Sequence, residues 1–96
     1  MAEEKIHKAL PVLIGSPKQT EWGFGLRKIK LQQLFAYANK LREAEDMTEG
    51  EREVLDEAVD NIRLKADVKY WIAIRFEDIK KLVTQEVNRI YKQRTE

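Results

Sequence analysis

Apolar side chains recur every three to four positions over most of this chain, and that spacing constrains its fold more than any other feature. Residues spaced in this way share one face of an α-helix, and several such faces buried against one another form a helical bundle. The stretch 69–76, KYWIAIRF, has a composition typical of a strand, but the helical spacing continues through it. The sequence therefore predicts an all-α fold, a three-helix bundle with an extended N-terminal arm.

Two helix starts can be located from their capping residues. Ser16 is a favourable N-cap, a proline follows at the first helical position, and Gln19 can bond back to the cap to complete a capping box. Thr48 and Glu51 repeat this arrangement, and a third apolar pattern begins after Asp67. The expected helices are residues 17–44, 48–65 and 67–92.

The first predicted helix carries a broad apolar face that includes Trp22. We expect Trp22 and Trp71 to anchor the core, because each tryptophan offers a large apolar area to bury. The alternative function of these residues is a partner-binding hot spot. Gly23 and Gly25 are unfavourable in a helix interior and mark either a kink or a close backbone contact. The helix also holds more apolar side chains than three helices readily bury, which is compatible with self-association. The side chains in excess are Phe24, Leu31 and Phe35.

The 96 residues are expected to form one helical domain, residues 16–96, preceded by an arm at residues 1–15. The arm contains an apolar run that Pro11 favours in an extended conformation and that Gly15 ends. An extended apolar segment usually packs against another surface. We therefore expect the arm to lie across the helices.

Residue types that form common catalytic and metal sites are scarce. The chain has no cysteine, which excludes disulfides, a thiolate zinc site and a cysteine nucleophile. Its one histidine, His7, lies on the arm, and no nucleotide-binding glycine loop is present. We therefore expect a protein that is not an enzyme and that uses no cofactor and no metal.

Hydropathy limits the location of the chain. No run of about 18 apolar residues is present, so we expect no membrane-spanning segment. The N-terminus also lacks the pattern of a signal peptide. These features favour a cytoplasmic protein.

Acidic residues are concentrated in one part of the chain. Residues 43–60 include nine acidic residues and one basic residue, a local charge of −8 in a chain of net charge +1. Four of the acids follow each other at spacings of four, three and four, which places them on one helix face. Such a row could mimic nucleic-acid phosphates and dock on a basic groove of a protein partner, or it could be an ordinary solvated face. The four are Glu49, Glu53, Asp56 and Asp60.

Basic residues on the first and third predicted helices offer an alternative. If they converge, they could hold the phosphates of a nucleic acid. They lie far apart in sequence, and no exposed aromatic side chains are expected between them. The alternative nucleic-acid-binding residues are Arg27, Lys28, Lys30, Lys80, Lys81 and Arg89.

The segment Leu10–Trp22, LPVLIGSPKQTEW, resembles the start of a group of small, mostly uncharacterised bacterial proteins found among phage and mobile-element genes. The start of that group reads Leu-Pro-x-Leu-x-Gly-Ser-x-Lys-Gln-x-x-Trp. A second segment, KYWIAIR at Lys69–Arg75, resembles a Lys-Trp-Trp-Ile-x-x-Arg segment of the group, with Tyr70 in place of the first tryptophan. Gly23 and Gly25 depart from the group. The resemblance implies a phage or mobile-element setting and no particular activity.

Together these features favour a non-enzymatic binding protein that docks on a protein partner through its acidic row. One such role is inhibition of a host defence nuclease, in the manner of anti-CRISPR proteins, within the cytoplasm of the host cell. A small nucleic-acid-binding accessory protein is the alternative.

Overall fold

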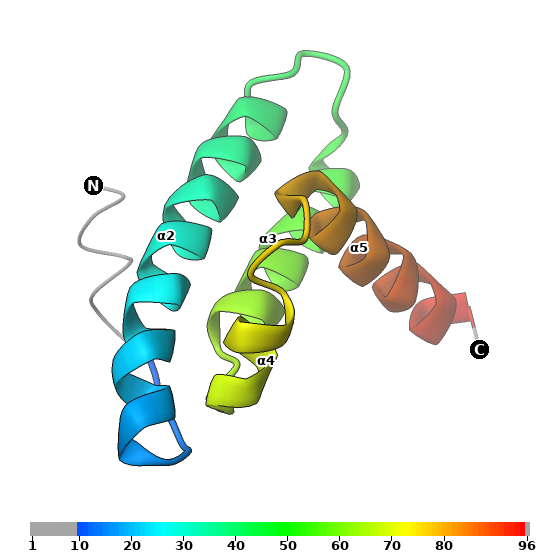
Figure 1. Cartoon of the computed structure of the whole chain (residues 1–96). Coiled ribbons are helices and arrows are strands. Elements are labelled where there is room, and N and C mark those ends of the chain that lie inside the picture. Colours follow the sequence, from blue (N-terminus) through cyan, green and yellow to red (C-terminus); the bar gives the residue numbers. More distant parts are fainter. Residues whose placement is uncertain (1–9, 96) are drawn as a thin grey trace.

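The computed structural model describes residues 10–95, and the predictions for His7 and for the first nine residues of the arm fall outside this range. Four helices form a bundle, and residues 10–95 contain no strand, which confirms the all-α prediction. The longest helix, α2, lies beside α3, and α5 runs toward the C-terminus (Figure 1). Along its length α5 packs against α3, where Ile90 is buried with Val54 and Ala58. The helices are α2 (Pro17–Arg42), α3 (Glu49–Arg63), α4 (Val68–Ala73) and α5 (Ile79–Thr95).

The predicted capping boxes are present at both helix starts. The Ser16 hydroxyl accepts a hydrogen bond from the backbone N–H of Gln19 at 3.2 Å, and the Gln19 side chain accepts from the Ser16 N–H at 3.4 Å. Thr48 and Glu51 form the same reciprocal pair, with both bonds at 3.1 Å. The bond from the Thr48 N–H lowers the pKa of the Glu51 carboxyl below its ordinary value. Local sequence therefore fixes where α2 and α3 begin.

The prediction of one continuous helix over residues 67–92 is wrong, because the chain turns between α4 and α5. Asp67 caps α4 by accepting from the Lys69 N–H at 2.9 Å. Asp78 acts in the same way for α5, accepting from the Lys80 N–H at 3.0 Å. An aspartate that bonds to backbone N–H groups ahead of it competes with helix continuation. The apolar spacing survives the turn, which is why the break is not visible in it.

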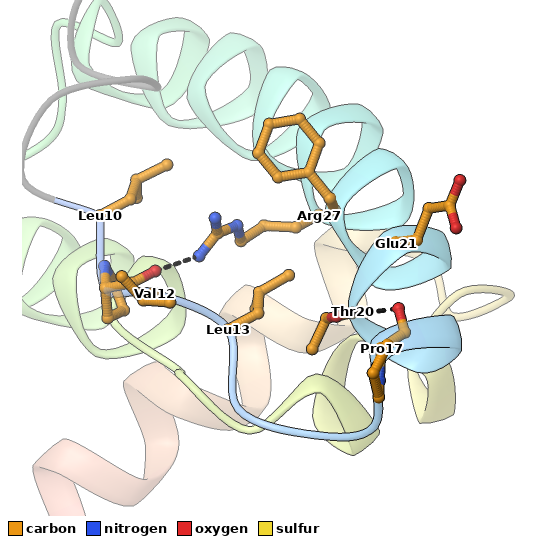
Figure 2. A pocket seen from close by; sticks show the side chains of 9 residues that line it. Leu10, Val12, Leu13, Pro17, Thr20, Glu21 and Arg27 are labelled. Atoms are coloured by element: carbon orange, nitrogen blue, oxygen red, sulfur yellow. Dashed lines mark hydrogen bonds between the residues drawn. The ribbon is translucent and has the colours of Figure 1, made fainter.

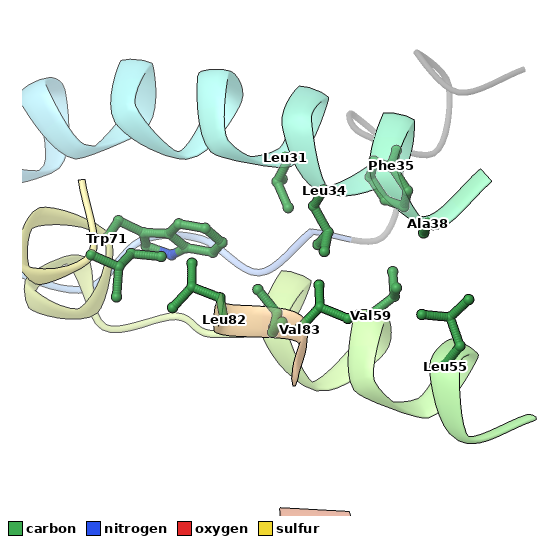
Figure 3. Packing of buried hydrophobic residues seen from close by; sticks show 11 residues of the cluster. Leu31, Leu34, Phe35, Ala38, Leu55, Val59, Trp71, Leu82 and Val83 are labelled. Atoms are coloured by element: carbon green, nitrogen blue, oxygen red, sulfur yellow. The ribbon is translucent and has the colours of Figure 1, made fainter. Parts of the chain in front are cut away.

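One buried cluster joins all four helices (Figure 3). Trp71 is 1% exposed and donates a hydrogen bond from its indole N–H to the Lys65 carbonyl at 2.9 Å, so it is a core anchor as predicted. Leu31 and Phe35 are also buried, and so are not in excess of what the bundle can cover. The members of the cluster are Leu31, Leu34, Phe35, Ala38, Leu55, Val59, Ile62, Trp71, Ile74, Leu82 and Val83.

The buried face of α2 differs from the predicted one. Gly23, Arg27 and Lys30 point inward, whereas Trp22 and Ile29 are about half exposed. The prediction that Trp22 anchors the core is therefore wrong. Between residues 23 and 30 the inward positions of this helix hold a glycine and two basic residues, which hydropathy alone places outside.

Gly23 marks a close contact and not a kink, since α2 continues unbroken through it. A Cβ atom at Gly23 would overlap Cγ2 of Val68, and a Cβ at Gly15 would overlap Cγ1 of the same side chain. Val68, the first residue of α4, thus lies between the two glycines. Nothing lies within 4 Å of the position that a Cβ would take at Gly25. Of Gly23 and Gly25, only Gly23 is required by packing.

The described part of the arm, residues 10–15, is fixed to the start of α4. The Ile14 N–H donates to the Ala66 carbonyl at 2.9 Å, and the Val68 N–H donates to the Ile14 carbonyl at 3.0 Å. Leu10 and Leu13 pack against the main cluster. The arm therefore covers one side of the core.

Within residues 10–95, no helix has both the length and the apolar composition needed to cross a bilayer.

Candidate partner-binding surfaces

The four carboxylates predicted to bind a partner all lie on the exposed side of α3. Two of them have arginine partners: Arg42 of α2 donates to Asp56, and Arg63 pairs with Asp60 at 2.8 Å. The side chains of Asp56 and Asp60 are still 54% and 56% exposed. Ion pairs as open as these contribute little stability. We name the row Glu49, Glu53, Asp56 and Asp60 the acidic face.

The negative charges of the other two members of the acidic face, Glu49 and Glu53, are not balanced by basic side chains in ion pairs within the described chain. Neither Glu49 nor Glu53 forms an ion pair with any residue in the range 10–95, and both are exposed. Helix geometry places successive members of the face about 4.5 to 6 Å apart along the axis. The face is thus an ordered anionic row that remains open to solvent.

The six basic residues of the alternative prediction do not form one surface. Arg27 and Lys30 point into the molecule, and each donates to a backbone carbonyl. Lys81 and Arg89 are exposed on α5, but each pairs with an acidic residue one turn earlier. The two that are exposed without an ion pair in the described chain are Lys28 and Lys80.

Trp22 contributes to a surface that the sequence did not predict as a whole, where α2 approaches the turn after α4. The guanidinium carbon of Arg75 is 5.3 Å from the ring centre of Trp22 and 4.7 Å from that of Phe76. Trp22 is 50% exposed and Phe76 is 88% exposed. Exposed aromatic rings beside an arginine are typical of protein-binding hot spots and of platforms that stack nucleic-acid bases. We name Trp22, Arg75 and Phe76 the aromatic cluster.

The signal for the aromatic cluster is the position of Gly23. A glycine that permits close packing must face inward, and its neighbour Trp22 then lies about 100° away around the helix. Ile29, seven residues after Trp22, shares its face and is exposed as well. The sequence contains this information, but it becomes decisive only once Val68 is known to contact Gly23.

An open groove of about 590 Å³ lies between residues 10–13 of the arm and the start of α2 (Figure 2). Leu10, Leu13 and Phe24 line it with apolar surface. Arg27 crosses it and donates to the Pro11 carbonyl at 2.7 Å. Burial lowers the pKa of Arg27 below its ordinary value. We name this depression the arm groove.

Within residues 10–95, no group of three or more histidine, aspartate or glutamate side chains could hold a metal ion. The basic side chains near the core are bonded to backbone carbonyls and not to acidic partners. The candidate surfaces described above are thus the acidic face, the aromatic cluster and the arm groove.

Comparisons with known proteins identified no match to this chain. No family model, no curated protein and no solved structure matches the chain. The resemblance to phage and mobile-element proteins stays a prediction.

Proposed function

We propose that this protein is a non-enzymatic binding protein that docks on a basic groove of a protein partner through the acidic face. The observation that carries the proposal is the row of four carboxylates on one exposed side of α3, of which Glu49 and Glu53 have no basic partner within the described chain. Removal of these charges costs the fold little, because the ion pairs of the other two are exposed.

The acidic face repeats negative charge along one line, as a nucleic-acid strand does, at a wider axial spacing. Carboxylates repeat about every 4.5 to 6 Å along α3, and one nucleic-acid strand carries a charge about every 3.4 Å of its axis. A partner that holds nucleic acid in a basic groove would attract both, with association that is fast at low salt. The resemblance to phage and mobile-element proteins favours a host defence nuclease as the partner.

The test replaces all four carboxylates by amides, as E49Q, E53Q, D56N and D60N, and captures partners from a bacterial host lysate. The matched control removes four acidic charges elsewhere, as E21Q, E43Q, E45Q and D46N. We expect the acidic-face variant to lose the partner and the control to keep it, with equal helicity by circular dichroism. An excess of duplex DNA should displace the partner from the wild-type protein.

Two results would contradict this proposal. The first is equal capture by the wild-type protein and the acidic-face variant. The second is a partner that duplex DNA does not displace, because a phosphate mimic and DNA compete for the same groove. If only the second result is obtained, the acidic face still binds a protein partner, but it does not act as a phosphate mimic.

The aromatic cluster favours a second candidate function, the binding of single-stranded nucleic acid. Trp22 and Phe76 present exposed aromatic rings beside the Arg75 guanidinium. Stacking of a base on such a ring contributes about 1 to 3 kcal/mol. This site differs from the predicted basic one, since Arg27 and Lys30 are directed inward.

Fluorescence polarisation with a labelled single-stranded oligonucleotide, at two salt concentrations, tests this second function. We expect F76A to weaken binding about tenfold, and Y91A, which removes an exposed aromatic ring from α5, to leave binding unchanged. Absence of salt-sensitive binding by the wild-type protein would eliminate this candidate.

A further inference from the structure

Arg27 is a buried cation without an acidic partner in the described chain. The residue is 6% exposed, and its one polar contact within residues 10–95 is the hydrogen bond from a terminal nitrogen to the Pro11 carbonyl. No carboxylate in residues 10–95 forms an ion pair with it. Buried charges in proteins are normally paired, because removal of a charge from water is costly.

The guanidinium has donors to spare. An arginine carries five N–H groups in a planar fork that matches a carboxylate. One terminal nitrogen is directed at Pro11, and the Phe24 ring centre lies 5.9 Å from the guanidinium carbon. Among the described residues, no fully buried side-chain nitrogen lacks a hydrogen-bond partner, so the donors of Arg27 that have no partner are accessible. The arm groove runs along this side chain (Figure 2). These donors are therefore available to a ligand in the groove.

The rest of the groove is suited to an apolar side chain. Leu10, Leu13 and Phe24 supply apolar walls, and Phe24 remains 57% exposed. The Thr20 hydroxyl donates to the Pro17 carbonyl at 3.0 Å and is already occupied. A volume of about 590 Å³ lies within the range of ordinary ligand sites. The groove thus combines one cation with apolar walls. Glu21, which lies six residues before Arg27 in α2, also lines the groove and is exposed to solvent.

We propose that the arm groove binds the carboxyl terminus of a partner polypeptide that ends in an apolar residue, with Arg27 as the anchor of the terminal carboxylate. The apolar side chain of the last residue lies against Leu13 and Phe24. The groove is open along its length, which suits a peptide because the peptide backbone can remain solvated. A fatty acyl chain would leave apolar surface in water there. This site is separate from the acidic face and does not rest on the proposed function.

The test uses the full chain and a fluorescein-labelled tetrapeptide, Gly-Ser-Ala-Leu, with a free carboxylate. The control peptide is the same sequence with an amidated end. We expect saturable binding of the free acid in fluorescence polarisation and at least a tenfold weaker binding of the amide, since hydrogen bonds between charged groups are the stronger ones. Equal binding of both peptides, or binding of neither, would overturn the proposal.

Variants locate the peptide on the protein. R27Q should abolish the difference between acid and amide, while K28Q, which removes a charge from an exposed neighbour, should preserve it. Because R27Q also removes the bond to Pro11, L13A serves as a second variant that keeps the cation. It should weaken both peptides and retain the preference for the acid. A preference for the acid that persists in R27Q would assign the carboxylate to another residue.

Other occupants give distinct results. Decanoate that competes for the groove more strongly than the peptide would show a lipid-like ligand and overturn the assignment to a polypeptide. A concentration-dependent dimer in sedimentation velocity that excludes the peptide and is lost in L13A would assign the groove to a second copy of the chain. The wild-type protein could fail to bind the peptide while the E3Q or E4Q variant binds it. That result would show that Arg27 binds a carboxylate of the chain itself, and it would overturn the proposal.

Discussion

The ammonium group of Lys30 on α2 donates a hydrogen bond of 2.7 Å to the backbone carbonyl of Glu77, in the turn that separates α4 from α5. Lys30 is buried, and its side chain reaches from α2 to a turn that lies 47 residues later in the chain. A tertiary contact therefore supports the break in what the sequence presents as one apolar pattern.

The first prediction concerns this contact. K30M should lower the free energy of unfolding by about 1 to 3 kcal/mol, because it leaves a partly buried carbonyl without its charged donor. Urea unfolding followed by circular dichroism measures the change. K28M, at an exposed position of the same helix, should shift the midpoint little. Similar losses in both variants would mean that the contact with Glu77 has no special role.

The second prediction separates the two glycines of α2. G23A should destabilise the protein, because the new methyl group overlaps Val68, whereas G25A should stabilise it by up to about 1 kcal/mol through helix propensity. Thermal unfolding measures both. V68A should also reduce the cost of G23A in a double-mutant cycle. Additive effects of G23A and V68A would show that the overlap is relieved elsewhere.

The third prediction contrasts the two tryptophans. W71F should destabilise the protein by about 1 to 3 kcal/mol, because it leaves a gap in the core and an unpaired Lys65 carbonyl. W22F should change stability by less than about 0.5 kcal/mol, since Trp22 is half exposed. Acrylamide should quench the fluorescence of W71F, which retains Trp22, more strongly than that of W22F. The reverse order of quenching would contradict the assigned burial.

The fourth prediction concerns Tyr70, whose ring packs edge-on against Trp71 at 5.1 Å. Burial, with a smaller contribution from the negative charge of Glu86, raises the pKa of Tyr70 to about 12 from an ordinary value of 10.0. The folded state therefore holds this proton more tightly than the unfolded state. Its contribution to stability is complete below pH 10 and is lost as the pH rises toward 12.

Absorbance of tyrosinate measures that titration. The wild-type protein should show a tyrosine transition near pH 12, and Y70F should lack that transition. The difference in unfolding free energy between pH 9 and pH 11.5 should be smaller in Y70F. A late-ionising tyrosine that persists in Y70F would assign the shift to a different ring.

Local rules were sufficient for the helix starts and for most of the core. Capping side chains act within one turn, so Ser16 and Thr48 could be interpreted without knowledge of the rest of the fold. Trp71 follows from the spacing of its own apolar neighbours. These features depend on residues close in sequence, which is why the sequence alone predicts them.

The candidate sites depend on contacts between distant segments and were predicted less well. The acidic face follows from helical spacing and is exposed as expected. The inward direction of Arg27 depends on the Pro11 carbonyl, and that of Lys30 depends on the Glu77 carbonyl. Hydropathy assigns both to solvent. The aromatic cluster was missed for the same reason, since Trp22 faces outward only because Gly23 faces Val68.

The two backbone hydrogen bonds between Ile14 and the segment 66–68 also set the order in which this protein can mature during synthesis. The partner groups of Ile14 are made more than 50 residues after it. A ribosome must therefore release most of the chain before the arm can close, and until then Val68 cannot fill the space between Gly15 and Gly23. The arm can therefore close only after α2 and α3 have been translated, because its backbone partners follow both helices in the chain.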